Sequence, residues 1–311
     1  TTIISLQKEK SNNSFKYLGF EKVDVKEDNF KVAESTLSKE LDQLTLTEEP
    51  WYFNSKEESE ILRKINSGGK PIKEFESISI RMGVKTGFDN AFIIDQKTYD
   101  NLISEDSNSR VIKPILRGRD IKKYHYEHKD LYLLFIPWHF PLDDDSTISG
   151  SSEQAEKAFL ENFPKIYDHL NQHKQKLLKR NQAETGVRYE WYCLQRAAST
   201  FLEDYYKEKI IWGLISGHWN FAFDNKSIFV SSASYFLVSD KIPVKLILGL
   251  INSKLYRYHF DLFGEKTAGG AYVFKKTTIE KFLIPNNLSN VTELVEKIEL
   301  ILKEDSIEIR A

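Results

Sequence analysis

RMGVKTGFDNAFIID, residues 81–95, and RVIKPILRGRDIKKY, residues 110–124, decide how the fold of this chain is interpreted. The first segment places a glycine-containing loop, 83–90, between two apolar runs, which predicts two strands joined by a loop. The second segment combines one acid, Asp120, with six basic residues: Arg110, Lys113, Arg117, Arg119, Lys122 and Lys123. Because the formal net charge of the chain is only -2, this positive charge is local. A local basic patch is typical of a surface that holds a phosphate backbone.

Length and composition indicate a folded protein of one large domain or two. The 311 residues are 41% hydrophobic and 13% aromatic, which is ample for a core. No apolar run reaches the roughly 18 residues that cross a bilayer, and no signal-peptide pattern opens the chain. The single cysteine, Cys193, is expected to be a core residue without a disulfide. We therefore expect a cytoplasmic protein without a membrane partner.

The hydrophobic pattern alternates between strand-like and helical segments and predicts a mixed α+β fold. A helix is expected after Asn54 or Ser55, with Glu57 and Glu58 in its first turn. A second helical segment with one apolar face covers 159–180 and restarts at Pro164. A third helix is expected from Pro243 to about residue 260. Strands are expected at 77–82, 91–94, 131–136, 210–215, 221–223, 227–230, 235–238 and 271–274.

The two ends of the chain differ from its centre. Residues 1–20 have the pattern of a β-hairpin, and residues 21–50 read as a polar linker with a short helix near 38–46. The main domain is expected over 51–288. Residues 289–311 predict an amphipathic helix, which Asn290 and Glu293 would cap.

Five pieces of the chain, in order, resemble the C-terminal specificity domain of TaqI-like DNA methyltransferases and of related fused restriction-modification enzymes. They are WYFNSKEESEILRKI from residue 51, GVKTGFDNAFIID with IKPILRGRDIKKY, FPKIYDHLNQHKQKLLKR over 163–180, YKEKIIW, and LILGLINSKLYRYHFDLFGEKTAGGAYVFKKTTIEKFLIP over 246–285. The resemblance implies a target-recognition fold similar to the domains of Type I specificity subunits, with double-stranded DNA as partner. It also implies an upstream adenine-N6 methyltransferase domain, whose sheet would end in the 1–20 hairpin.

Two motifs that a DNA adenine methyltransferase needs are missing from this sequence. None of its eight prolines are adjacent, so the Asn/Asp-Pro-Pro-aromatic loop that holds a flipped base is absent. No Gly-x-Gly occurs, so a glycine-rich turn for S-adenosylmethionine is absent too. We therefore expect no catalytic residue and no cofactor in this chain. S-adenosylmethionine, and Mg²⁺ where a nuclease is fused, would belong to the parent enzyme.

Two candidate metal sites have simpler interpretations. Asp120, Glu127 and Lys129 formally match an Asp, Glu-x-Lys nuclease pattern, but the apolar strand context is missing and surface charge is the favoured interpretation. His169 and His173 lie one helical turn apart, but a third ligand is not evident. The sequence predicts no metal site.

The first candidates for DNA contact lie in the loop after residue 82. Lys85 and Thr86 stand between Gly83 and Gly87, small residues that permit a close approach of the backbone to a groove or a phosphate. The alternative is an ordinary turn with a solvated lysine. We favour contact with DNA.

The second candidates lie in the basic segment. Arg117 and Arg119 flank a glycine, and their guanidinium groups suit guanine edges or phosphates. Internal ion pairs, for instance with Asp120, are an equal alternative. Lys122 and Lys123 are expected to hold the DNA backbone.

The third candidates lie in two later loops. His218 and Trp219 stand in the loop 216–220 between two strands, where they would read base edges, although a core position for Trp219 is equally favoured. Lys266 stands in the glycine-rich loop 264–270. The basic residues of the 165–180 helix either touch phosphate or are simply solvated.

Taken together, the sequence predicts a non-catalytic domain that recognises a DNA sequence for a restriction-modification enzyme. Two alternatives remain open. One is a complete but divergent methyltransferase or nuclease. The other is a protein-interaction module that docks a separate methyltransferase through the C-terminal helix and the helix after Pro164.

Overall fold

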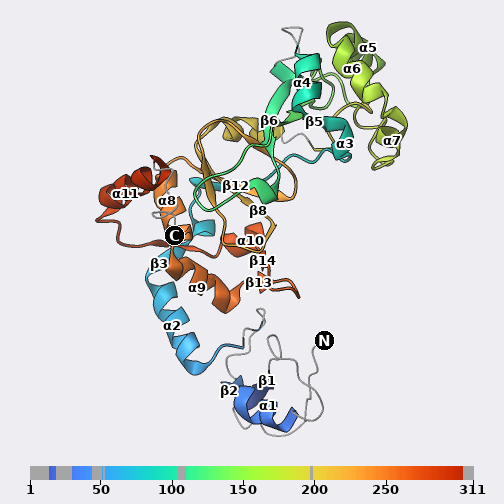
Figure 1. Ribbon diagram of the computed structural model, residues 1–311. Helices are drawn as coiled ribbons and strands as arrows, with labels where there is room; N and C mark the ends of the chain where they lie inside the picture. The colour runs from blue at the N-terminus through green and yellow to red at the C-terminus, as the bar shows by residue number, and fades with distance from the viewer. Residues whose placement is uncertain are drawn as a thin grey trace.

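The computed structural model describes residues 14–18, 30–43, 51, 53–103, 110–196 and 199–303, and at its centre is an antiparallel sheet with a hydrophobic core on each face. The strand order is β10–β8–β12–β4. The strands are β4 (Ile78–Met82), β8 (Lys209–Gly213), β10 (Ala222–Asp224) and β12 (Ser234–Ser239). In Figure 1 this sheet lies between helices α5 to α7 on one side and α8, α9 and α11 on the other.

The two cores follow from the alternation of side chains along β8 and β12. Ile211 and Phe236 face the first core, whereas Ile210, Trp212 and Leu237 face the second. Successive residues of a strand point to opposite faces, so a strand with apolar residues at successive positions is buried on both faces. All five residues of β8 are buried.

A second, mixed sheet of four strands and a set of helices surround the first core. The strand order is β11–β6–β7–β5, with β11 parallel to β6. The strands are β5 (Ile93–Asp95), β6 (Ile112–Leu116), β7 (Leu131–Leu134) and β11 (Phe229–Val230). The helices are α3 (Asp89–Phe92), α4 (Gln96–Leu102), α5 (Glu153–Asn162), α6 (Pro164–Asn171), α7 (Lys174–Lys179) and the 3₁₀ turns η5 (Gly118–Asp120) and η6 (Ser199–Tyr206).

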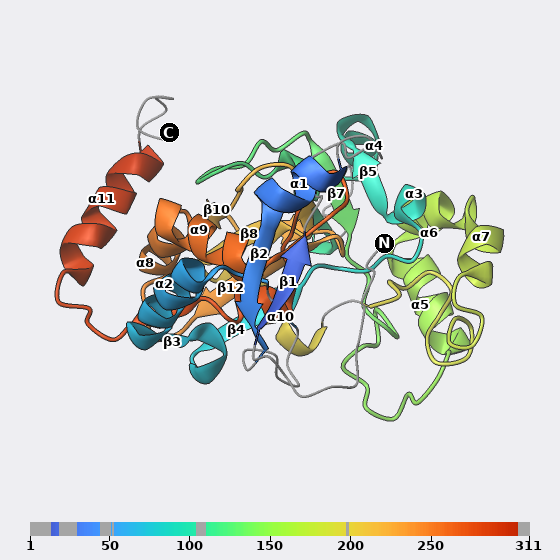
Figure 2. The ribbon, with the colours of Figure 1, turned by 90° about the horizontal axis from the view of Figure 1, so that it is seen from below.

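Two small sheets and a further set of helices enclose the second core. The strands are β3 (Gly69–Pro71) with β15 (Leu283–Pro285), and β9 (Ile215–Ser216), β13 (Glu265–Lys266) and β14 (Tyr272–Val273) in the order β13–β14–β9. The helices are α2 (Lys56–Ser67), η3 (Ile72–Glu74), α8 (Val244–Ile251), α9 (Lys254–Phe263), α10 (Lys276–Ile279) and α11 (Val291–Lys303). Helix α11 packs along α8, as Figure 2 also shows.

A buried ion pair joins β8 to β10. The Lys209 ammonium lies 2.5 Å from Asp224 Oδ2, and both side chains are fully buried. Lys209 also donates to the Tyr205 carbonyl at 2.6 Å, and Asp224 accepts hydrogen bonds from the Tyr126 hydroxyl at 2.7 Å and the Ile228 amide at 3.0 Å. Burial lowers the pKa of Lys209, while the nearby Asp224 carboxylate opposes that shift. The pair is therefore satisfied on both sides, as a buried charge must be.

The expected α+β fold is confirmed, and so are several of its local signals. Ser55 caps α2 and forms a reciprocal capping box with Glu58. Pro164 is the first residue of α6. The helix expected from Pro243 to about residue 260 is two helices, because Ser253 accepts a hydrogen bond from the Tyr256 amide and begins α9 anew.

The N-terminal expectations need a correction. Strand β1 (Ser14–Leu18) pairs with β2 (Ser38–Asp42), so residues 38–42 are a strand and not the short helix expected near 38–46. The pairing register with β1 prevails over the local helical tendency. Helix α1 (Phe30–Leu37) precedes β2 within the segment expected to be a linker. The rest of the expected 1–20 hairpin lies outside the described residues.

The roles expected for two glycines also need a correction. A side chain at Gly83 would overlap the backbone oxygens of Val230 and Ser231, so this glycine permits a close approach within the protein. Gly87 has a φ of 78° and lies against the Arg180 side chain. Both glycines are therefore explained by internal packing rather than by a groove or a phosphate.

Removing the charge of Asp224 should destabilise the fold strongly. We expect Asp224→Asn to lower the free energy of unfolding by about 3–5 kcal/mol, because Lys209 would remain buried without its counter-charge. Chemical denaturation measures the effect. Asp240→Asn removes an exposed partner of Lys207 and should cost less than about 1 kcal/mol. Equal effects of the two substitutions would show that the buried pair has no special importance.

Gly83→Ala should destabilise the protein by about 1–3 kcal/mol or more, since the added methyl group meets backbone atoms that cannot move aside. Gly217→Ala is the matched control, because a side chain there meets no atom within 4 Å. Thermal unfolding of both variants checks the prediction. The prediction is wrong if Gly83→Ala unfolds at the same temperature as the wild type.

Candidate nucleic-acid interface

The basic segment 110–124 divides into two parts. Arg110 lies over the Phe163 ring at 5.1 Å, and Lys113 lies over the Tyr206 ring at 5.8 Å, beside the first core. The remaining basic residues follow β6, in η5 and the turn after it. The expected cluster of six is thus four neighbouring residues, 117–123, and two that lie apart.

The acid of this segment points inward. Asp120 is 1% exposed; its Oδ2 accepts from the Arg117 amide at 3.3 Å, and its Oδ1 lies 3.6 Å from Lys129 Nζ. Neither the Arg117 nor the Arg119 guanidinium forms an ion pair within the described part of the chain. The side chains that η5 presents outward are therefore basic. Arg119 is exposed and Arg117 is half-buried.

Lys122 and Lys123 occupy a tight turn anchored to the second core. The Lys122 amide donates to the His125 carbonyl at 2.9 Å, and Ile121 pairs with Tyr126. Tyr124 adopts a positive φ of 71°, buries its ring in the second core and donates its amide to the Phe221 carbonyl at 2.8 Å. This anchor holds a backbone conformation that few non-glycine residues adopt.

The loop 216–220 lies beside this basic segment. A side chain at Gly118 would come within 3.1 Å of Gly213 Cα, so two glycines let η5 pack directly on the end of β8. Asn220 donates from its side chain to the Ile121 carbonyl at 3.2 Å. The structure thus brings together residues about one hundred positions apart in sequence.

The two candidates in this loop differ in position. His218 is exposed. Trp219 is 7% exposed; it packs against Phe221 and Phe260 and donates its indole N–H to the Ile251 carbonyl at 2.8 Å. Of the two alternatives for Trp219, the structure has the core position, so we exclude it from the surface proposed below.

Lys85 and Thr86 also differ in their exposure to solvent. Lys85 is exposed, and its backbone pairs with Arg196. Thr86 is 3% exposed, donates to Asp89 Oδ1 at 2.5 Å and offers its carbonyl to Arg180. Arg180 is itself buried and donates to the carbonyls of Trp191 and Cys193 as well. The expected basic face of the 165–180 helix therefore includes a residue that binds the protein's own backbone.

Lys266 lies in an ordered hairpin, β13–β14, rather than in a flexible loop. Its ammonium lies 2.6 Å from Asp261 and 5.2 Å from the centre of the Tyr272 ring. Its charge is therefore balanced within the protein.

Helix α9 adds two basic residues that the sequence interpretation missed. Lys254 and Arg257 are exposed on α9. Burial lowers the pKa of Lys123, and the positive charges of Lys254 and Arg257 lower it further. Their spacing of three residues on an amphipathic helix was the available signal.

Comparison with known families agrees with the earlier resemblance. The family model described as the TaqI-like C-terminal specificity domain matches residues 113–284, more than half of the 311-residue chain. The chain belongs to this family. The match includes the basic segment from Lys113, the loop 216–220 and helix α9, so these three features are parts of the specificity domain.

Two curated proteins are similar to this specificity domain. The Type II methyltransferase M.PaeR7I of Pseudomonas aeruginosa is 21% identical over 247 residues, and the Type II methyltransferase M.BstVI of Geobacillus stearothermophilus is 19% identical over 252 residues. The matches cover 79% and 81% of this chain but 39% and 41% of the relatives. The chain thus spans about two fifths of the length of these proteins.

A solved structure supports the fold. The Type IIL restriction-modification enzyme MmeI, determined in complex with DNA, superposes with a TM-score of 0.51 at 17% sequence identity. The superposition covers 75% of this chain and 28% of MmeI. The α+β architecture of this chain is therefore shared with part of MmeI.

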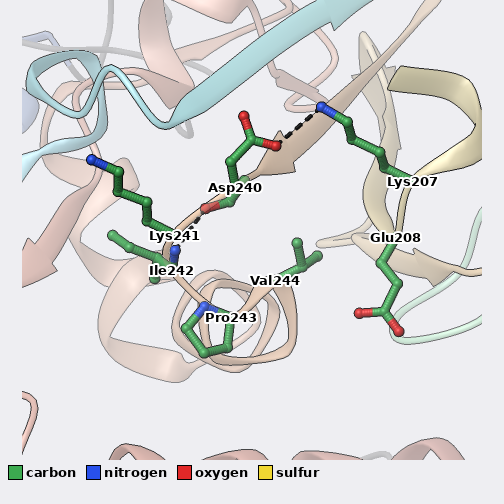
Figure 3. Close-up of a pocket in the computed structure, with 8 residues that line it drawn as sticks. Lys207, Glu208, Asp240, Lys241, Ile242, Pro243 and Val244 are labelled. Carbon is green, nitrogen blue, oxygen red and sulfur yellow. Dashed lines mark hydrogen bonds and ion pairs between the residues drawn. The ribbon is translucent and has the colours of Figure 1, made fainter. Parts of the chain in front are cut away.

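A shallow hollow of about 530 Å³ in the specificity domain has no evident chemistry of its own. Residues from the end of β12 and the start of α8 line it, together with Lys207 and Glu208 (Figure 3). Lys207 pairs with Asp240 at 3.0 Å and with Asp204 at 3.1 Å, so its charge is balanced.

Within the described ranges, no group of three potential metal ligands occurs, and no helix is long and apolar enough to cross a membrane. Asp120 is used internally, and Cys193 is buried as expected.

A smaller apolar pocket of about 230 Å³ contains a buried histidine. His259 of α9 lines it with Leu250, Leu255 and Tyr256. The imidazole is 3% exposed and packs edge to face on Phe263 with ring centroids 4.7 Å apart. Burial lowers the pKa of His259 to about 4, so the ring is neutral near pH 7.

This histidine should make the stability of the specificity domain depend on pH. Below its ordinary pKa of about 6.5, the imidazole takes up a proton in the unfolded chain but not in the folded one, until the pH reaches about 4. Its contribution to stability therefore falls by about 3 kcal/mol from pH 6.5 to pH 4. The difference in unfolding free energy between the wild type and His259→Leu should change by that amount over this range.

His218→Gln, which removes an exposed imidazole, is the control and should follow the wild type. Parallel pH profiles for the wild type and His259→Leu would contradict a neutral His259.

Proposed function

We propose that this chain recognises double-stranded DNA in a sequence-selective way, as the specificity domain of a restriction-modification enzyme. One observation carries the proposal. The basic turn 117–123, whose only acid points inward, lies beside the loop 216–220, in which Gly217 and His218 are exposed. Such a surface combines charge for the phosphate backbone with polar tips that can reach base edges.

The proposed roles follow from exposure. Lys122 and Lys123 would set the register on the DNA backbone. Arg117, Arg119 and His218 would read base edges or nearby phosphates. Lys85 is exposed on the loop after β4 and would contact the DNA backbone. Lys266, paired with Asp261, would contribute least.

The chemistry would reside in another part of the parent enzyme. The two similar proteins are named as Type II methyltransferases, and this chain spans about two fifths of each. We propose that an adjacent methyltransferase domain of the same polypeptide binds S-adenosylmethionine and methylates adenine N6, with Mg²⁺ required where a nuclease is fused. The chain itself would select the site without catalysing the reaction. The absence of adjacent prolines and of Gly-x-Gly in the sequence supports this division.

The first test is selection of binding sites from random oligonucleotides with the full-length protein. We expect enrichment of one short sequence. Affinity for that sequence and for an unrelated duplex is then measured at several salt concentrations. Binding to neither, together with salt-insensitive capture of a methyltransferase, would instead support a protein-interaction module. Methyl transfer or cleavage by this chain alone would support the enzyme alternative.

Two substitutions should separate the roles. Lys122→Ala should weaken binding to both duplexes alike and reduce the salt slope by about 1. Arg119→Ala should relax one base position at a cost of about 1–3 kcal/mol on the selected sequence. Lys157→Ala, an exposed lysine on α5, is the control. If Lys122→Ala and Arg119→Ala both bind as the wild type does, the proposed surface is wrong.

A further inference from the structure

The exposed face of α9 carries its charge in a fixed orientation. Tyr256 and Phe260 of this helix are buried in the second core, which sets the rotation of α9 about its axis. Lys254 and Arg257 lie one turn apart on the opposite, exposed face. Their positions are therefore determined by the core and not by a mobile loop.

One backbone carbonyl connects this helix with the basic turn. The Phe221 carbonyl accepts a hydrogen bond from the Tyr124 amide at 2.8 Å and another from the Asn252 side chain at 2.9 Å. Tyr124 directly follows Lys123, and Asn252 lies two residues before Lys254. The shared carbonyl thus places Lys123 next to the start of α9.

The three cations have no counter-charge of their own. Within the described part of the chain, no ion pair involves Lys123, Lys254 or Arg257, whereas Lys266 nearby is paired with Asp261. Beyond the effect of burial, the charges of Lys254 and Arg257 lower the pKa of Lys123, so holding the three together has an electrostatic cost. Binding of a polyanion would relieve this repulsion.

Tyr272 of β14 orients one member of the group. The Arg257 Nε donates to the Tyr272 hydroxyl at 3.0 Å. The Tyr272 ring is 7% exposed and stacks on Phe274 at 5.4 Å, so the hydroxyl is rigidly placed. This bond leaves the two terminal nitrogens of the guanidinium available for a phosphate.

We infer that Lys123, Lys254 and Arg257 form a phosphate-binding strip that holds the backbone of double-stranded DNA beside the bases that the loops read. Tyr272 is a positioning residue for Arg257. The inference rests on the proposed function and adds α9 to the surface that contacts DNA. The strip reads no base, because its contacts are to phosphate alone.

The test measures binding of full-length Lys254→Gln and Arg257→Gln proteins to the selected duplex and to an unrelated duplex. Each substitution should weaken both complexes by the same factor, roughly fivefold near 0.1 M salt. The slope of log affinity against log salt should fall by about 0.9 for each lost phosphate contact. Both residues are exposed and lie beside other cations, so thermal unfolding should occur at or slightly above the temperature of the wild type.

Two control variants carry the same change in net charge. Lys157→Gln lies on α5, far from α9 in both views of the molecule, and should leave binding unchanged (Figures 1 and 2). Lys266→Gln removes a lysine that is already paired and should have a smaller effect than Lys254→Gln.

Tyr272→Phe tests the positioning role. It should weaken binding less than Arg257→Gln does, and it should cause no further loss in the Arg257→Gln background. An equal loss in both backgrounds would show that Tyr272 acts independently of Arg257.

The remaining outcomes distinguish this inference from the proposed function. Wild-type affinity and salt slope for both Lys254→Gln and Arg257→Gln would overturn the strip while leaving DNA recognition intact. A loss confined to the selected duplex would identify base readers and contradict a phosphate role. Failure of the wild-type protein to bind any duplex would overturn the proposed function and the strip with it.

Discussion

The charged pair inside the central sheet is the constraint on which the other elements depend. Lys209 and Asp224 are adjacent on β8 and β10, and neither is stable there without the other. Asp224 also accepts a hydrogen bond from the hydroxyl of Tyr126, which lies three residues after the basic turn 117–123. The core therefore anchors the surface, because Asp224 of β10, which pairs with Lys209 of β8, also holds Tyr126 close to the segment proposed to hold DNA. The residues that stabilise the central sheet thus also position the segment proposed to hold DNA.

Hydrogen bonds to backbone carbonyls join several of the elements that surround the central sheet. Arg180 gathers three of them, from Thr86, Trp191 and Cys193, and so joins α7 to the loop after β4. The Phe221 carbonyl joins the basic turn to α9. Each arrangement satisfies polar groups that would otherwise be buried without partners. Such contacts hold in place the backbone that carries the charged side chains, which would reduce the entropy lost on binding.

Local signals in the sequence were sufficient to predict most helices and strands, but they did not predict where single side chains such as Trp219 and Arg180 lie. The period of β8 and β12, the cap at Ser55 and the proline at 164 each act within a few residues, so the pattern predicts them. The position of Trp219 depends on Phe260 and Ile251, which lie some thirty to forty residues away. The internal role of Arg180 depends on carbonyls from separate loops. No periodicity encodes such contacts, and the grouping of Lys123 with α9 likewise exists only after folding.

The contact between Gly118 and Gly213 has a consequence for how specificity can change. Because the two backbones touch, the turn that carries Arg117 and Arg119 and the strand that leads into loop 216–220 form one mechanical unit. A new loop taken from a relative would fit only if both glycines came with it, or if both backbones shifted together. Exchange of recognition properties between such domains is therefore expected to proceed by paired segments, not by single loops.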